Sequence, residues 1–141
     1  MKTDIRNSID WRVPNYEAWD KPEHELQVAI VTRSLVFSGD FPEVQLLHAI
    51  PNGGFRGMKA GRDLKAEGVL PGIPDLFLPV ARDGYHGLYI ELKNARGRVK
   101  DDQWEIMQQL YAGGYAVALC NEMRFPLLII ENYLKGELLH L

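Results

Sequence analysis

The sequence has almost no cysteine and no long hydrophobic run, and each absence excludes a class of protein. Its single cysteine, Cys120, excludes a disulfide within the chain and a zinc site made of cysteines alone. No apolar stretch approaches the length of a membrane span, and the polar residues 1–11 do not resemble a signal peptide. We therefore expect a cytoplasmic protein without a membrane partner, in which Cys120 is a small buried hydrophobic residue.

Positive charge is not in excess, because the formal net charge is −3, which argues against an indiscriminate nucleic-acid binder. Two stretches nevertheless gather basic side chains: Arg56, Lys59, Arg62 and Lys65, then Arg96, Arg98 and Lys100. At about 100° per residue, the first four spread over roughly half of a helix circumference and would contact phosphates along a groove. A basic rim around an acidic metal pocket would give this distribution, and so would an ordinary solvated surface.

Two short segments have the composition of a metal-dependent hydrolase site. Pro74 and Asp75 begin one apolar run that reads as a strand, and Glu91, Leu92 and Lys93 end another. Side chains alternate along a strand, so Glu91 and Lys93 point to one side and Leu92 to the core. Two carboxylates beside an ammonium group suit metal-assisted phosphodiester hydrolysis. Each segment alone is also common elsewhere, as a turn or as a solvated strand face.

Periodicity and turn residues predict one α/β domain, with an N-terminal arm over residues 1–19 and the folded domain over residues 20–141. The expected helices cover residues 20–37, 57–67, 101–112 and 125–135. The expected strands cover residues 44–50, 75–80, 87–93 and 115–120, with 138–139 as a further edge. We expect Asp20 to cap a first helix that is covered on more than one side. The middle strands form an antiparallel hairpin, and the last strand returns parallel to it by a right-handed crossover.

This α-β-α-β-β-α-β-α order, with P-D and E-L-K on its middle hairpin, resembles the PD-(D/E)xK nuclease fold. More closely, the chain resembles the VRR-NUC family. The matching residues are Glu25, residues 48–54, residues 64–76, Glu91 to Lys93, and Gln103. The G-x-P-D-L element and the Asn-Gly-Gly turn are fairly specific, whereas E-x-K is not. Similar family members stand alone, often in phage genomes, and the resemblance implies a homodimer that acts on branched DNA.

The resemblance also implies roles for individual residues. Asp75 and Glu91 would bind Mg²⁺ or Mn²⁺ together with the backbone carbonyl of Leu92, and Glu25 would add a carboxylate directly or through water. Lys93 would orient the attacking water or stabilise developing charge, and Gln103 would position that lysine or water. Without the resemblance, Gln103 is equally a polar residue on the exposed side of a helix. The residues expected to contact nucleic acid are Asn52, Gly53, Arg56, Lys59, Arg62, Lys65, Arg96, Arg98 and Lys100.

The leading hypothesis is therefore a Mg²⁺- or Mn²⁺-dependent DNA endonuclease, homodimeric, that cuts branched DNA such as Holliday junctions or flaps. Two alternatives remain open: a non-catalytic module of the same fold that binds nucleic acid or a partner, and a restriction-like nuclease for linear duplex. His48 and Asn52 are similar to the His and Asn of HNH nucleases, but the further histidines of that family are missing. His48 otherwise serves as a structural residue, or as a hydrogen-bonding partner of the Asn-Gly-Gly turn or of a phosphate.

Overall fold

The computed structural model describes residues 17–51 and 57–138 and contains a four-stranded mixed sheet with the strand order β1-β2-β3-β4. The first three strands pair antiparallel, and β3 and β4 pair parallel, which confirms the predicted mixed α/β sheet and its middle hairpin. The strands are β1 (His48–Ala49), β2 (Leu76–Leu78), β3 (Leu88–Leu92) and β4 (Ala116–Cys120).

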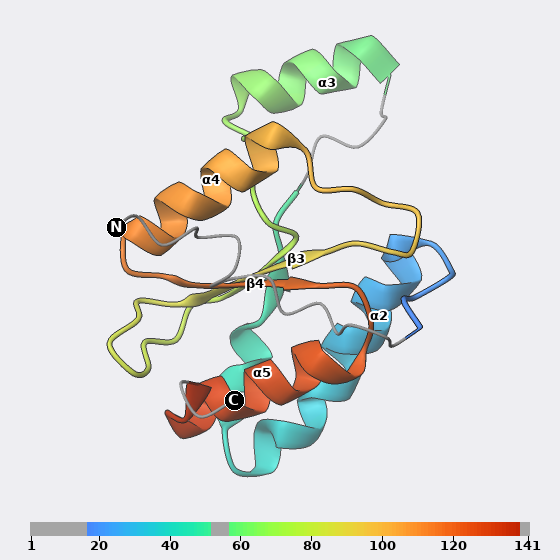
Figure 1. The fold of residues 1–141 in the computed structure, drawn as a ribbon. Coiled ribbons are helices and arrows are strands. Elements are labelled where there is room, and N and C mark those ends of the chain that lie inside the picture. The colour runs from blue at the N-terminus through green and yellow to red at the C-terminus, as the bar shows by residue number, and fades with distance from the viewer. Residues whose placement is uncertain (1–16, 52–56, 139–141) are drawn as a thin grey trace, which may run out of the picture.

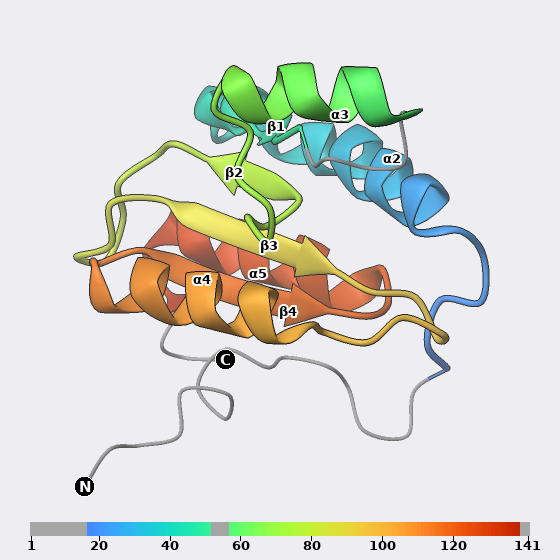
Figure 2. The same cartoon turned by 90° about the horizontal axis from the view of Figure 1, so that it is seen from above.

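Helices cover both faces of this sheet. They are α2 (Glu23–Ser34), α3 (Gly57–Ala66), α4 (Asp101–Ala112) and α5 (Arg124–Lys135), with the 3₁₀ helices η1 (Leu35–Gly39) and η2 (Pro42–Leu46). Figures 1 and 2 show α2 and α5 on one face and α4 on the other, with α3 standing out on the α4 side over the β1 edge. No helix in the described part of the chain is long and apolar enough to cross a membrane.

The main core lies between the sheet and the pair α2 and α5. Leu88, Ile90 and Leu92 of β3 point into it and are at most 1% exposed, as strand alternation predicts. A second, smaller cluster forms on the opposite face, where Met107 of α4 packs on Val117 of β4. Every residue of β4 is buried, including Cys120, because helices cover this strand on both sides. The intervening side chains of β3 therefore face the α4 side, where the functional residues lie.

A tight turn sets the register of the β2–β3 hairpin. Asp83 and Gly84 have φ values of 54° and 82°, and Arg82 and Tyr85 exchange two backbone hydrogen bonds around them. An Asp-Gly pair in this left-handed conformation is typical of the two-residue turns that match the twist of a hairpin. The turn lies between β2 and β3 and aligns them so that Leu76 pairs with Ile90, which brings the position before β2 beside Glu91.

The first helix differs from its prediction in two ways. Pro22 rather than Asp20 occupies the N-cap, without a side-chain hydrogen bond, and the α-helix ends at Ser34 before the 3₁₀ turn η1. Its buried face consists only of Leu26, Ile30 and Ser34. The expectation of cover on more than one side is wrong, because Val28 is 51% exposed and no element of the described chain buries it.

The predicted strand over residues 44–50 is also largely wrong. Residues 42–46 form η2, and only His48–Ala49 pairs with β2. Pro42 favours the first turn of a helix, and a strand at this edge of the sheet would have only one partner strand. Residues 42–46 therefore form a 3₁₀ helix rather than a strand. At the other end of the chain, Leu138 packs into the core without joining the sheet, and Leu139 lies outside the described residues.

Candidate active site

The hairpin brings two carboxylates together at the end of β3. Asp75 precedes β2, and its Oδ2 accepts a hydrogen bond of 2.8 Å from the backbone N–H of Leu92. Its own carbonyl accepts a bond of 2.9 Å from the N–H of Ile50, which joins it to the edge strand. Because Leu76 pairs with Ile90, Asp75 lies next to Glu91 on the neighbouring strand. Three strands thus fix the position of the Asp75 carboxylate.

Glu91 is the most constrained group of the site, since only 1% of the residue is exposed. Its Oε1 lies 3.1 Å from Gln103 Nε2 and 3.4 Å from Lys93 Nζ. Its Oε2 is the one buried side-chain nitrogen or oxygen in the described residues that has no hydrogen-bond partner. The pKa of this carboxyl is raised from 4.5 to about 8, first by burial and then by the charge of Asp75, while Lys93 opposes the shift.

Lys93 lies on the same side of the strand as Glu91, as alternation predicts. Its backbone N–H donates to the carbonyl of Cys120 at 3.0 Å, which continues the β3–β4 pairing by one residue. Its side chain is 10% exposed and carries its ammonium to the Glu91 carboxylate, while Leu92 between them is buried in the core. The ammonium therefore stands beside the carboxylate pair in a largely water-free setting, where a charge acts strongly on its neighbours.

Gln103 reaches the same carboxylate from the first turn of α4. Its Oε1 accepts a hydrogen bond of 2.9 Å from the backbone N–H of Lys100, so this oxygen caps the helix start. The amide orientation is then fixed, because the other end of the amide must be the Nε2 that donates to Glu91 at 3.1 Å. Gln103 is half-buried, and the alternative of an exposed polar helix residue is wrong.

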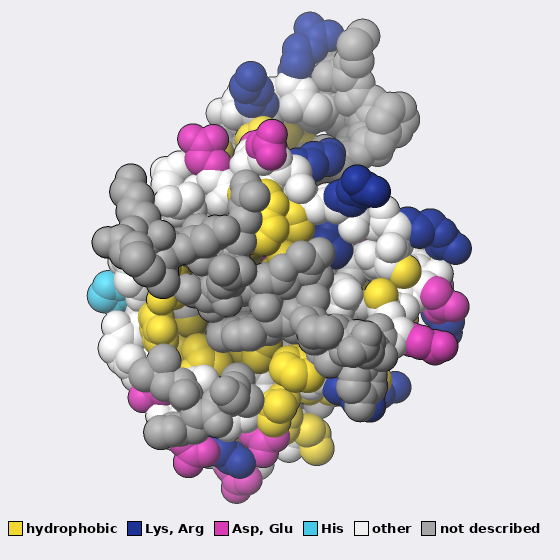
Figure 3. Space-filling view, in the orientation of Figure 1, with side chains coloured by type: hydrophobic (Ala, Val, Ile, Leu, Met, Phe, Trp, Pro, Cys, Tyr) yellow, Lys and Arg dark blue, Asp and Glu magenta, His cyan; other side chains and the backbone are white. Residues whose placement is uncertain are grey.

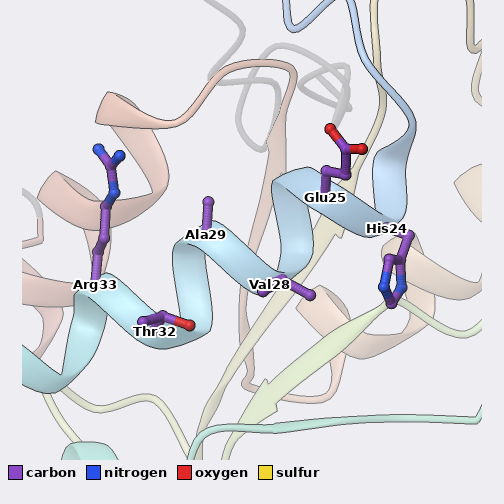
Figure 4. Close-up of a pocket in the computed structure, with 6 residues that line it drawn as sticks. All are labelled: His24, Glu25, Val28, Ala29, Thr32 and Arg33. Carbon is purple, nitrogen blue, oxygen red and sulfur yellow. The ribbon is translucent and has the colours of Figure 1, made fainter.

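Glu23, which the sequence analysis missed, is the α2 carboxylate that the structure brings toward Glu91. It adds to the raised pKa of Glu91, and its Oε1 accepts a 3.4 Å bond from the N–H of Asn94 just after Lys93. Glu25, the predicted residue, is exposed and lies on the outer face of α2 (Figure 4). A helical signal could have found Glu23, since it precedes the buried Leu26 by three residues and therefore shares its face.

The loop after β3 holds Glu23 in place. Asn94 Oδ1 accepts from the backbone N–H groups of Arg96 and Gly97 at 3.1 and 2.8 Å, and its Nδ2 donates to the carbonyl of Lys21 at 3.1 Å. Gly97 leaves room for Glu23, because a Cβ on this glycine would lie 2.7 Å from Glu23 Oε1. A larger residue at position 97 would therefore displace the helix carboxylate or the loop.

Basic side chains lie around this site. In Figure 3, lysine and arginine side chains gather on α3 and beside the loop that follows β3. Arg62 and Lys65 are exposed on α3, as are Arg96, Arg98 and Lys100 in the loop. Lys59 belongs to α3, whereas Asn52, Gly53 and Arg56 lie outside the described residues.

His48 lies on the neighbouring edge strand and is exposed. Its Nδ1 is 2.8 Å from the carbonyl of Leu46, and its ring meets Phe77 edge-on at 5.9 Å. This ring packing fits the structural role that the sequence analysis kept open for His48, and its exposed edge leaves a phosphate contact open as well.

The oxygen atoms of the site fit a hard divalent cation. Among residues 17–51 and 57–138, no group of three or more His, Cys, Asp or Glu side chains is arranged to hold a metal ion. The site offers instead the two carboxylates of Asp75 and Glu91, and Glu91 keeps one oxygen without a hydrogen bond. Mg²⁺ is typically held by one or two carboxylates with water completing its shell, so this donor set fits it better than it fits zinc.

Comparison with known proteins points to one family. The family model of the VRR-NUC domain matches residues 14–123. A solved structure described as a "VRR_NUC domain protein" superposes with a TM-score of 0.66 at 28% sequence identity, covering 80% of this chain and 88% of that chain. None of the curated proteins matches the chain.

Proposed function

Because the chain belongs to the VRR-NUC family, which is of the nuclease type, we propose that it is a divalent-metal-dependent DNA endonuclease that cuts branched DNA as a homodimer. One observation carries this proposal: Asp75, Glu91, Lys93 and Gln103 come from two strands and a helix to one point, where the buried Glu91 carboxylate still lacks a partner for Oε2. A structural ion pair would not leave such an oxygen unsatisfied, because an unmade buried hydrogen bond costs about 1–3 kcal/mol.

The metal would be held by the carboxylates of Asp75 and Glu91 and by the backbone carbonyl of Leu92, with Glu23 as a further ligand, directly or through water. When bound, Mg²⁺ or Mn²⁺ makes a coordinated water a nucleophile and neutralises charge on the scissile phosphate. Lys93 orients the attacking water or stabilises the charge that develops on the phosphate. Gln103 holds Glu91 in position through its amide, and the exposed arginines and lysines of α3 and the loop bind the DNA backbone.

A preference for DNA shape over DNA sequence is expected because the exposed basic residues are suited to contact phosphates. Contacts to phosphates supply affinity and register but carry no sequence information. Each active site cuts one strand, so paired cuts across a symmetric junction need two copies related by a twofold axis. These two arguments favour a junction or flap over a defined duplex sequence.

Cleavage of labelled four-way junction, flap and linear duplex DNA, each with Mg²⁺, Mn²⁺ or EDTA, tests the proposed function. We expect cutting of the branched substrates only with the metals. Equal rates on linear duplex would keep the nuclease and refute the branch preference. A folded protein that does not bind the metals and does not cut any of the substrates would instead be the non-catalytic binding module.

Glu23→Gln and Glu25→Gln form a matched pair that tests the third carboxylate. We expect Glu23→Gln to lower the cleavage rate by roughly 10–100-fold, the usual cost of losing a group that supports a metal site. Glu25→Gln should leave the rate of single-strand cutting within about twofold, because Glu25 lies on the outer face of α2 and each active site cuts one strand by itself. Rates at saturating Mg²⁺, with a Mg²⁺ titration for each variant, make the measurement. A larger loss in Glu25→Gln than in Glu23→Gln would return the role to Glu25.

A further inference from the structure

The outer face of α2 consists of two rows of exposed or half-buried side chains with a shallow pocket between them. One row contains His24, Val28 and Thr32, and the other contains Glu25, Ala29 and Arg33, each at intervals of four residues. Figure 4 shows these six side chains on successive turns of the helix, with the two charged groups of the second row at its ends. Such rows at i, i+4 spacing are the ridges that pack into the groove of another helix.

This face is apolar in the middle, and nothing in the described chain covers it. Val28 is 51% exposed, and the following η1 and η2 also carry exposed apolar side chains, Leu35 at 46%, Val36 at 78% and Leu46 at 52%. Four of the seven large hydrophobic side chains that are exposed in the described residues therefore belong to α2, η1 and η2. A concentration of exposed apolar side chains on one surface of a globular protein marks an interaction site.

We propose that this face binds the same face of a second copy of the chain, with the two α2 helices antiparallel and the twofold axis passing near Ala29. Glu25 and Arg33 each lie four residues from Ala29, on opposite sides of it. The arrangement therefore places Glu25 of each copy opposite Arg33 of the other. Alanine at the crossing point lets the two helix backbones approach closely, and Val28 and Thr32 fill the space beside it. A twofold interface uses the same patch on both copies, as this self-complementary face requires.

Charge and chemistry favour this occupant over DNA. The two rows carry one acidic and one basic side chain besides His24, so the face has no excess of positive charge to attract phosphates. The helix dipole also favours Glu25 in the first turn and Arg33 in the last turn. The dipole does not account for the exposed apolar residues between them, whereas a second copy would cover them.

The interface gives the homodimer of the proposed function, on which it rests, a defined geometry. Glu23 lies six residues before Ala29, or about 9 Å along the helix axis, so the two Glu23 residues would lie about 18 Å apart along that axis. That separation corresponds to about five base-pair steps of a duplex. Both active sites could therefore act near one branch point.

Two single charge reversals and their mixture test the interface by mass, without DNA or metal. We expect the wild type to be a dimer at about 100 µM by light scattering coupled to size exclusion, and Glu25→Arg and Arg33→Glu each to weaken dimerisation at least tenfold, through repulsion of like charges. Mixing the two variants should restore a dimer. In the mixed dimer the introduced arginine faces the introduced glutamate, and the unchanged Arg33 faces the unchanged Glu25.

The matched control is Glu105→Arg, which makes the same charge change at an exposed position of α4 and should remain as dimeric as the wild type. Circular dichroism of each variant should match the wild type, because the substituted side chains are exposed. A monomeric wild type would overturn the interface, and so would dimeric single variants or a mixture that stays monomeric. Since mass is measured without cleavage, a failure here leaves the proposed nuclease activity to be judged on its own assay.

Discussion

Asp75→Asn is expected to lower metal-dependent cleavage of branched DNA by at least about a thousandfold while leaving the fold intact. A metal at this site would supply several kcal/mol of charge stabilisation, and each 1.36 kcal/mol is worth about tenfold in rate. Asparagine keeps the size of the side chain and one oxygen that can accept the bond from the Leu92 N–H. The substitution therefore removes the negative charge and spares the hydrogen bond that joins the two strands. Single-turnover cleavage of a labelled junction, with melting curves for both proteins, measures the two effects separately.

Asp40→Asn is the matched control for this experiment, because Asp40 is exposed at the end of η1 and is not part of the site. It removes the same charge and should cut at the wild-type rate. Normal cleavage by Asp75→Asn would contradict the site assignment. Loss of cleavage together with loss of the fold would show that the Asp75–Leu92 bond is chiefly structural, and Leu92 would then be the residue to examine.

The core of the site could be predicted because it depends on strand alternation, which is a property of the backbone. Glu91 and Lys93 lie on one strand, and Asp75 lies at the start of the strand that pairs with it. The Asp-Gly turn between the strands sets their register, and this register brings the three residues together. Asp75, Glu91 and Lys93 accordingly lie where the sequence placed them. Gln103 required one more step, since its distance to Glu91 depends on how α4 packs against β4.

The first helix and the edge strand could not be predicted with the same accuracy. The sequence contains two glutamates, Glu23 and Glu25, within one helical turn, and only the direction of the buried face distinguishes them. That face depends on the packing of Leu26 and Ile30 against the sheet, and the apolar Val28 obscures it because Val28 is exposed. The strand at residues 44–50 failed for a similar reason, because its length depends on a single partner strand.

Burial of the site was also underestimated. Strand alternation turns Glu91 and Lys93 away from the main core, yet Glu91 is 1% exposed and Lys93 is 8% exposed. The first turn of α4 and the loop over residues 94–97 close over the pair. The side-chain oxygens of Gln103 and Asn94 hold these two segments by accepting hydrogen bonds from backbone N–H groups. Contacts of this kind between segments distant in sequence leave no periodic signal, so the sequence does not reveal them.

Glu91→Gln is expected to stabilise the metal-free protein above neutral pH while abolishing cleavage. The pKa of Glu91 is about 8 in the folded protein and 4.5 ordinarily, so between these values the folded state keeps a proton that the unfolded state has lost. The folded state then binds more protons, and its free energy of unfolding falls as the pH rises from about 4.5 to about 8, levelling off above. Glutamine cannot ionise, so the variant loses this decline and at pH 8 should be more stable by a few kcal/mol, on the order of 10 °C in Tm.

Thermal unfolding of both proteins at steps from pH 5 to pH 9, with EDTA or with Mg²⁺, measures this effect. The difference between variant and wild type isolates Glu91, because every other titrating group is common to both. We expect the difference to be near zero at pH 5, to grow through pH 8 in EDTA, and to shrink in Mg²⁺, which stabilises only a protein that binds it. A variant that is less stable than the wild type at pH 8 in EDTA would mean that the ion pair with Lys93 outweighs the cost of burying the Glu91 charge. The Glu91 carboxylate would then serve mainly to stabilise the fold. The expected result would instead show that Glu91 destabilises the metal-free protein, as a residue kept to bind a cation would.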